Sequence, residues 1–134
     1  MTDEDFIALQ YVHPQLAACV VLAHRRYETL RPDRTFRVTS GLRTLAAQKA
    51  LVAAGKSRTM ESYHLDGLAV DLAILSRDRK QAFWTLPAYE YLNSLMQRAA
   101  AEVGCDLEWG GNWSSFKDGV HWQLMYAEPT LPRR

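Results

Sequence analysis

The sequence predicts an α+β fold in one domain. Three segments have the apolar periodicity of helices, and four shorter segments have the composition of strands. The chain has 134 residues, 48% of them hydrophobic, which is long enough for one domain with a core and too short for two ordinary ones. We expect a single unit over residues 1–134, with its core at about 14–126 and a peripheral tail at 127–134.

The first predicted helix runs from Pro14 to about Leu30. Apolar side chains recur there at the spacing of one helix face: Leu16, Ala17, Val20, Val21, His24 and Tyr27. His24 falls among apolar neighbours, which favours a packed residue over a metal ligand. Pro32 ends the helix, because proline cannot continue the hydrogen-bond pattern.

A strand and a second helix follow. Residues 35–40, TFRVTS, have the β-branched content and alternation of a strand, and residues 44–54 are expected to form a helix. Arg43 and Gln48 project from the junction between them, and such junctions commonly carry function. A second interpretation stays open, in which Thr44 caps the helix and Arg43 is a surface charge.

The segment 62–71, SYHLDGLAVD, places an imidazole and a carboxylate seven positions apart across a bend. His64 precedes the flexible Gly67, and Asp71 lies inside the apolar run 68–75, which predicts a buried strand. Small residues share the strand face of Asp71 and leave room for something to approach it. Zinc would fit these ligands, although a buried aspartate in a structural ion pair is the alternative.

The last third of the chain predicts one more helix and two strands. Pro87 suits a helix start, apolar residues recur along 88–103, and Gly104 suits the helix end. Residues 107–109 and 122–125 are typical of short strands. Three tryptophans in this region belong to the core or wall a groove: Trp109, Trp113 and Trp122.

A second histidine, His121, opens the last predicted strand directly after a turn. With His64 and Asp71 it would complete a three-ligand site that leaves a fourth position for water, as in catalytic zinc centres. Asp118 is then the candidate general base, with an ordinary turn aspartate as the alternative. Arg43 would supply positive charge to an oxyanion or to a substrate carboxylate.

Composition excludes several classes of protein. The net charge is +1 and 23% of residues are charged, so neither nucleic acid nor an anionic membrane is indicated as a partner. Cys19 and Cys105 lack CxxC spacing, which excludes a structural zinc knuckle, and free thiols are favoured over a disulfide. The first residues lack the pattern of a signal peptide, and no apolar run reaches transmembrane length, so we expect synthesis in a cytoplasm.

Three ordered motifs resemble those of the zinc D-alanyl-D-alanine carboxypeptidase family. They are SGxRT at residues 40–44, SxHxxGxAxD at 62–71 and DxxH at 118–121, and the resemblance spans about residues 14–124. The family includes D-Ala-D-Ala dipeptidases and the L-alanyl-D-glutamate endopeptidases that act as phage endolysins. Many members have glutamate where this chain has Asp118, and the shorter acid favours the endolysin branch.

The resemblance implies a small antiparallel sheet that carries a zinc site, with about three helices packed against it. It implies zinc as the cofactor and assigns roles to seven residues: His64, Asp71 and His121 as zinc ligands, Asp118 as general base, Arg43 as substrate or transition-state contact, and Ser62 and Gln48 as substrate-binding residues.

The implied function is hydrolysis of the L-alanyl-D-glutamate bond of the peptidoglycan stem peptide. Two alternatives are a D-Ala-D-Ala carboxypeptidase or dipeptidase, and a non-catalytic, zinc-stabilised wall-binding module. We expect a monomer that binds no nucleic acid and does not insert stably into membranes. It would accumulate in the cytoplasm and reach the wall, in the periplasm, through a separate holin-type protein.

Overall fold

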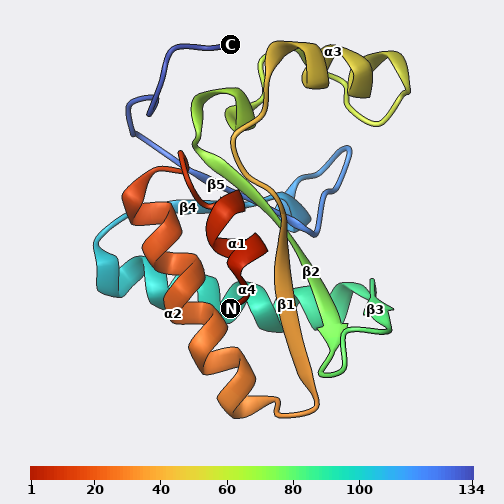
Figure 1. The fold of residues 1–134 in the computed structure, drawn as a ribbon, viewed down its shortest axis with the longest axis vertical. Helices are drawn as coiled ribbons and strands as arrows, with labels where there is room; N and C mark the ends of the chain where they lie inside the picture. The colour runs from red at the N-terminus through yellow and green to blue at the C-terminus, as the bar shows by residue number, and fades with distance from the viewer.

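The computed structural model describes residues 1–134, and its centre is an antiparallel sheet (Figure 1). Four strands follow the order β1-β2-β5-β4, and the short β3 pairs with β2. Their bounds are β1 Arg34–Ser40, β2 Ala69–Ser76, β3 Ala82–Phe83, β4 Leu107–Trp109 and β5 His121–Leu124. The predicted α+β class with a small antiparallel sheet is confirmed, and β3 is an addition to the strands expected from the sequence.

Four α-helices accompany the sheet: α1 Asp3–Ala8, α2 Pro14–Leu30, α3 Leu45–Ala53 and α4 Leu86–Val103. Two short 3₁₀ helices, η1 Tyr63–Asp66 and η2 Gly110–Asn112, lie beside the ligand strands. The last three α-helices agree with the sequence prediction, whereas α1 was not predicted. With six residues it is too short to show helical periodicity, and its one sequence signal is the capping box of Thr2 and Asp5.

The core lies between the sheet and two long helices, α2 and α4, which pack against each other. One face of β2 supplies Val70, Leu72 and Ile74, all fully buried, and β1 supplies Phe36. His24 of α2 is buried there and bonds the carbonyl of Phe36 at 3.1 Å. The alternation along β2 leaves Asp71 on the opposite face, away from the apolar core.

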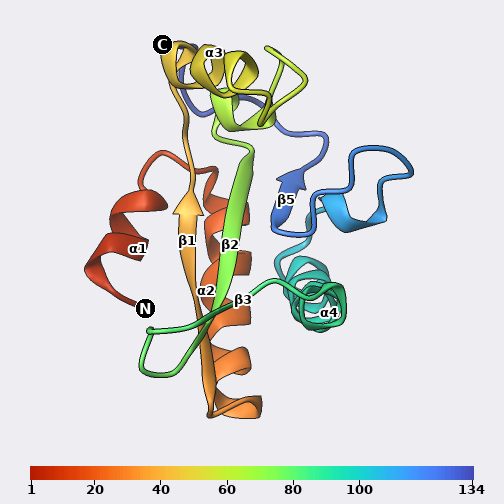
Figure 2. The same cartoon turned by 90° about the vertical axis from the view of Figure 1, so that its right-hand side faces the viewer.

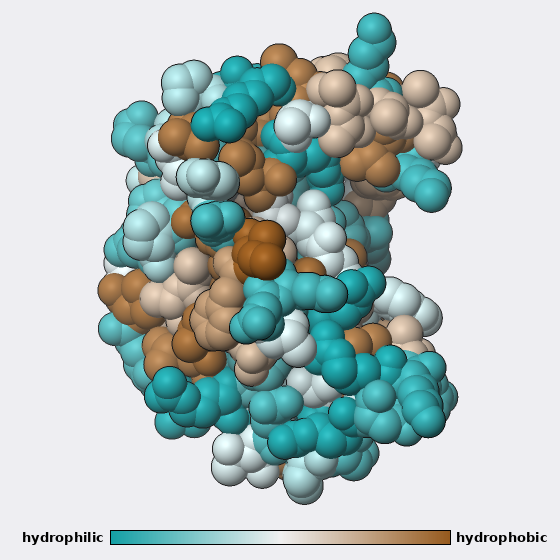
Figure 3. Space-filling view, in the orientation of Figure 1, coloured by the Kyte–Doolittle hydropathy of each residue, from teal (hydrophilic) through white to brown (hydrophobic).

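The short helix α1 lies beside the outer edge of β1 (Figure 2). Asp5 is buried, and its Oδ1 accepts the Val38 N–H at 2.8 Å, while its Oδ2 accepts the N–H and hydroxyl of Thr2. Phe6 and Ile7 of α1 are exposed to solvent. Figure 3 shows a hydrophobic patch near the centre of the face that it draws, in the region where Figure 1 places α1. Asp5 thus pairs an edge-strand N–H that the sheet leaves free.

Asp5→Ala is expected to lower the free energy of unfolding by about 3 kcal/mol. The substitution removes a charged acceptor and leaves the buried Val38 N–H without a hydrogen-bond partner. Burial alone would raise the pKa of Asp5, but hydrogen bonds from Val38 and Thr2 hold that pKa below its usual value. The stabilisation is therefore present above the unfolded pKa of about 3.9 and is lost as the pH falls through the lower folded value.

Urea unfolding at pH 7 and at acidic pH measures both effects. Asp3→Ala is the matched control, since Asp3 is an exposed carboxylate of the same helix that accepts no hydrogen bond from another residue. An Asp5→Ala variant as stable at pH 7 as the Asp3→Ala control would contradict the assignment.

One end of the molecule gathers α3, η1 and the segment 127–134 (Figures 1 and 2). The residues of this segment, expected to form a peripheral tail, are largely exposed but bound to η1. The Thr130 N–H donates to the Asp66 carbonyl at 3.0 Å, and Arg133 forms ion pairs with Asp66 and Glu61. The segment therefore braces the turn that carries His64.

Two further expectations concern the cysteines and membranes. Cys19 and Cys105 are free thiols with their Sγ atoms 3.6 Å apart, and burial raises the pKa of Cys19 to about 12. None of the helices combines the length and the apolar character that a membrane span requires.

Candidate metal centre

Three different elements position the predicted ligands. His64 lies in η1, where Ser62 caps the turn by accepting the His64 N–H at 3.2 Å. Gly67 ends the turn with φ of +71°, a conformation that favours glycine. Asp71 on β2 pairs directly with His121 on β5, so antiparallel register sets these two side chains next to each other on one face.

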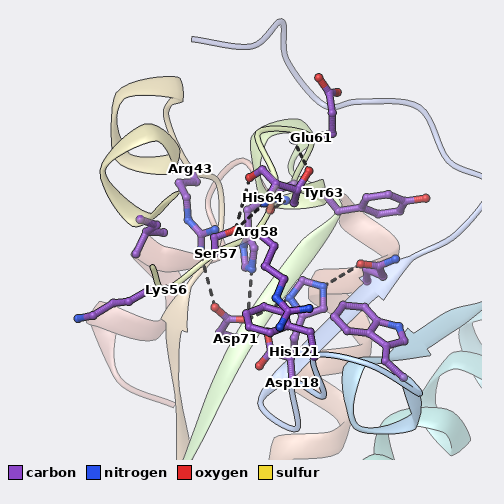
Figure 4. A pocket seen from close by; sticks show the side chains of 16 residues that line it. Arg43, Lys56, Ser57, Arg58, Glu61, Tyr63, His64, Asp71, Asp118 and His121 are labelled. Atoms are coloured by element: carbon purple, nitrogen blue, oxygen red, sulfur yellow. Dashed lines mark hydrogen bonds and ion pairs between the residues drawn. The ribbon is translucent and has the colours of Figure 1, made fainter. Parts of the chain in front are cut away.

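The three side chains converge on one point (Figure 4). Asp71 Oδ1 lies 3.2 Å from His64 Nε2 and 3.2 Å from His121 Nδ1. One nitrogen or oxygen from each residue falls within 4.8 Å of the others. Two imidazoles and a carboxylate at such separations are a donor set that holds a divalent transition metal.

The outer nitrogens of both histidines have partners that fix their tautomers. His64 Nδ1 lies 2.8 Å from the Gly41 carbonyl, and His121 Nε2 lies 2.8 Å from Gln123 Oε1. A carbonyl oxygen only accepts, so these outer nitrogens carry hydrogen, and loss of a proton from the inner nitrogens would leave their lone pairs facing the Asp71 carboxylate. With the inner nitrogens deprotonated, two imidazole lone pairs and one carboxylate face the same point, and this donor set fits a metal ion.

The pKa values of Asp71 and His121 are shifted by the contacts within this cluster. Burial alone would raise the pKa of Asp71, but hydrogen bonds and charge from His121 and His64 hold that pKa far below its usual value. Burial opposes charge on His121, yet the Asp71 carboxylate raises the pKa of His121 above its ordinary value. The Asp71 carboxylate thus stays ionised and attracts positive charge.

Arg43 lies beside the centre and is held by three acceptors. Its guanidinium donates to Gln48 Oε1 at 2.8 Å and to Ser40 Oγ at 3.1 Å, and lies 3.5 Å from Asp71 Oδ2. Burial lowers the pKa of Arg43, and the Asp71 charge opposes that shift. Thr44 caps α3 by accepting the Ala47 N–H, as the second interpretation expected, but Arg43 is half-buried and is not a surface charge.

The structure brings six of the seven predicted residues to one pocket and places the seventh behind it. Gln48 is completely buried and does not line the pocket; its amide donates to Ser57 Oγ at 2.9 Å and to the Thr59 carbonyl. Gln48 therefore connects Arg43 to the loop after α3. Ser62 does line the pocket, with its hydroxyl engaged at the start of η1.

The pocket is a cavity of about 470 Å³ over the three candidate ligands (Figure 4). Asp118 lines it from the loop before β5, and burial, followed by the charge of Asp71, raises the pKa of Asp118 above its ordinary value. Trp113 walls the pocket, whereas Trp109 and Trp122 are buried in the core. Sequence reasoning missed Arg58, Phe116 and other lining residues, because they lie on loops without a recognisable pattern.

A close backbone contact positions Asp118. Its N–H donates to the Gly110 carbonyl at 3.0 Å, and a Cβ added at Gly110 would lie 2.3 Å from the Asp118 carbonyl oxygen. Trp109 Nε1 donates to the Gly119 carbonyl at 2.7 Å and holds the other side of the loop. Only glycine at position 110 allows this approach.

Gly110→Ala is expected to lower kcat/KM about 100-fold by displacing Asp118, since a shift of about 1 Å in a catalytic group can cost that much. Metal content and secondary structure should be unchanged. Gly119→Ala is the control in the same loop, because its Cβ would meet no atom closer than 3.8 Å. Equal kcat/KM values for the two variants would show that the contact does not position Asp118.

Comparisons with known proteins all point to one group. The family model for phage L-alanyl-D-glutamate peptidases matches residues 2–124. The L-alanyl-D-glutamate peptidase of Listeria phage A118 is 35% identical over 63% of this chain and 28% of the phage protein. The peptidoglycan L-alanyl-D-glutamate endopeptidase CwlK of Bacillus subtilis (strain 168) is 30% identical over 66% of this chain and 59% of CwlK. The chain thus matches less than two thirds of either relative's length.

A solved structure is similar over almost the whole chain. The L-Ala D-Glu endopeptidase ChiX of Serratia marcescens superposes with a TM-score of 0.78 at 37% sequence identity. The match covers 94% of this chain and 90% of ChiX. The similarity therefore extends over the sheet and the elements that carry the three candidate ligands.

Proposed function

Because the chain belongs to the phage L-alanyl-D-glutamate peptidase family, we propose that it hydrolyses the bond between L-alanine and D-glutamate in the peptidoglycan stem peptide. The observation that carries the proposal is the convergence of His64, Asp71 and His121 on the floor of a pocket that also holds Asp118. The names of the relatives support the choice of bond.

The cofactor in this proposal is zinc, held by His64 Nε2, Asp71 and His121 Nδ1. Two imidazoles and one carboxylate form a three-ligand set that catalytic zinc uses, with a position left for water. Zinc bound there would lower the pKa of water to about 7 and polarise a carbonyl. Gly41 and Gln123 support this site by holding the outer nitrogens of the two histidines.

The protein's own residues supply the proton transfer and the remaining charge. Asp118 would accept the proton of the attacking water and return it to the leaving amine of D-glutamate, and its raised pKa suits both directions of transfer. Arg43, fixed by Gln48 and Ser40, would stabilise the negative charge that develops on the scissile carbonyl. Ser62 would contact the substrate at the pocket wall.

The cellular role in this proposal is that of an endolysin. The protein would act as a monomer, remain in the cytoplasm of the producing cell and reach peptidoglycan after a separate holin-type protein permeabilises the membrane. Size-exclusion chromatography with light scattering tests the monomer, and lysis in cells with and without such a protein tests the route.

Mass spectrometry of purified muropeptides tests the activity, with the protein supplied with zinc, treated with a chelator, or treated and resupplied. We expect zinc-dependent products separated between L-alanine and D-glutamate. Release of terminal D-alanine would instead identify a carboxypeptidase or dipeptidase. Metal binding without any cleavage would identify a wall-binding module.

A further inference from the structure

Arg58 spans the mouth of the pocket. It lies on the loop after α3, where Figure 4 labels it. Its guanidinium carbon stands 4.5 Å from the centre of the Phe116 ring, on the loop before β5. Both residues line the pocket, and both are exposed to solvent. The contact joins the two loops that face each other across the candidate metal centre.

The donors of Arg58 are free in this arrangement. A guanidinium that stacks on a ring turns its flat face to the aromatic surface, while its N–H groups point outward from the edge. Arg58 makes no ion pair, and its side chain donates no hydrogen bond to the protein. It therefore presents a forked, always charged donor to whatever enters the pocket.

The other cationic side chains that line the pocket, Arg43 and Lys56, are either engaged or directed away from it. The Arg43 guanidinium donates hydrogen bonds to Gln48 and Ser40 and lies beside the Asp71 carboxylate. The anionic Glu61 is paired with Arg133 at 2.8 Å. Lys56 has no ion-pair partner, but Figure 4 shows its side chain directed away from Asp71 and out of the pocket. Arg58 is thus the available cation over the site.

The proposed substrate carries a matching anion. Glutamate has two carboxyl groups beyond its amine, and a peptide chain that continues uses one of them. The residue on the leaving side of the scissile bond therefore keeps one free carboxylate. A planar carboxylate accepts two parallel N–H bonds from a guanidinium edge, which is the geometry that arginine favours.

We propose that Arg58 is a specificity residue that binds the free carboxylate of the D-glutamate residue, with Phe116 as the platform that orients the guanidinium. This inference rests on the proposed function. It makes the enzyme prefer stem peptides in which that carboxylate is free over those in which it is an amide. The amide is neutral, and its N–H groups cannot accept hydrogen bonds from the Arg58 guanidinium.

The test uses two synthetic stem peptides that differ only in this group, one with the carboxylate and one with the carboxamide. For the parent protein we expect kcat/KM to be at least about tenfold higher for the carboxylate peptide, the effect of one charge-assisted hydrogen bond or more. Arg58→Ala should remove this preference by raising KM for the carboxylate peptide alone.

Two further variants refine the test. Arg58→Lys keeps the positive charge but cannot donate two parallel hydrogen bonds, so it should retain part of the preference for the carboxylate peptide. Phe116→Leu keeps Arg58 but removes the aromatic ring on which its guanidinium stacks. This variant should lower the preference for the carboxylate peptide about two- to fivefold. Arg37→Ala is the matched control, because Arg37 is an exposed arginine on β1 that lies outside the pocket and makes no ion pair. It should leave the preference unchanged.

The outcomes separate this inference from the proposed function. Equal cleavage of both peptides by the parent protein, or an equal loss on both with Arg58→Ala, would overturn the role of Arg58 while the endopeptidase activity stands. Cleavage of neither peptide between alanine and glutamate would overturn the proposed function and this inference with it.

Discussion

Asp71→Asn is expected to abolish stable metal binding and to lower kcat/KM by about 1,000-fold or more. The carboxylate is the one anionic ligand among the three candidates, and both histidines direct their inner nitrogens at it. An amide oxygen leaves the cation without a formal counter-charge. The loss of several kcal/mol of transition-state stabilisation by the metal corresponds to the stated factor.

Metal content measured by mass spectrometry after dialysis, together with kcat/KM, checks this expectation. Asp106→Asn is the control, since Asp106 is exposed and its side chain makes no hydrogen bond or ion pair. Circular dichroism of both variants without metal separates misfolding from the loss of a ligand. An Asp71→Asn protein that keeps one metal ion per chain would refute the ligand assignment.

Asp118→Asn is expected to lower kcat by about 100- to 10,000-fold while metal content stays at the parent level, because removal of a general base has an effect of this size. The amide keeps the shape of the side chain and the hydrogen bond from the Asp118 N–H to Gly110. The loss would therefore report proton transfer and not the position of the loop.

Asp118→Glu provides the complementary variant, because a carboxylate remains and the added methylene has room in the pocket. We expect it to retain more activity than Asp118→Asn. An Asp118→Asn variant with unchanged kcat would remove Asp118 from the mechanism, even if the metal site behaves as proposed.

Local patterns predicted most of the fold. The apolar spacing in 14–30 and 88–103 corresponds to α2 and α4, and Gly104 ends α4 in the left-handed conformation at φ +87°. Such signals depend only on neighbouring residues, so they survive without knowledge of the partner surface. The strand β3, with two residues, and the helix α1 carry too little pattern to be recognised.

The candidate ligands were predictable for a similar reason. His64 and Asp71 share one short segment, and His121 opens a strand, so their residue types and order indicate the chemistry before any contact is known. Strand register then sets Asp71 opposite His121. The sequence by itself thus determined the element types, the ligand chemistry and the resemblance to a peptidase family.

Only the tertiary structure decided which residues support and surround that chemistry. It placed the Gly41 carbonyl on His64, buried Gln48 behind Arg43, and brought the Arg58 and Phe116 loops together over the pocket. These contacts join residues from separate elements, and no periodicity or short motif in the sequence predicts them. They depend on how the helices and loops pack around the sheet, because packing determines which distant side chains meet.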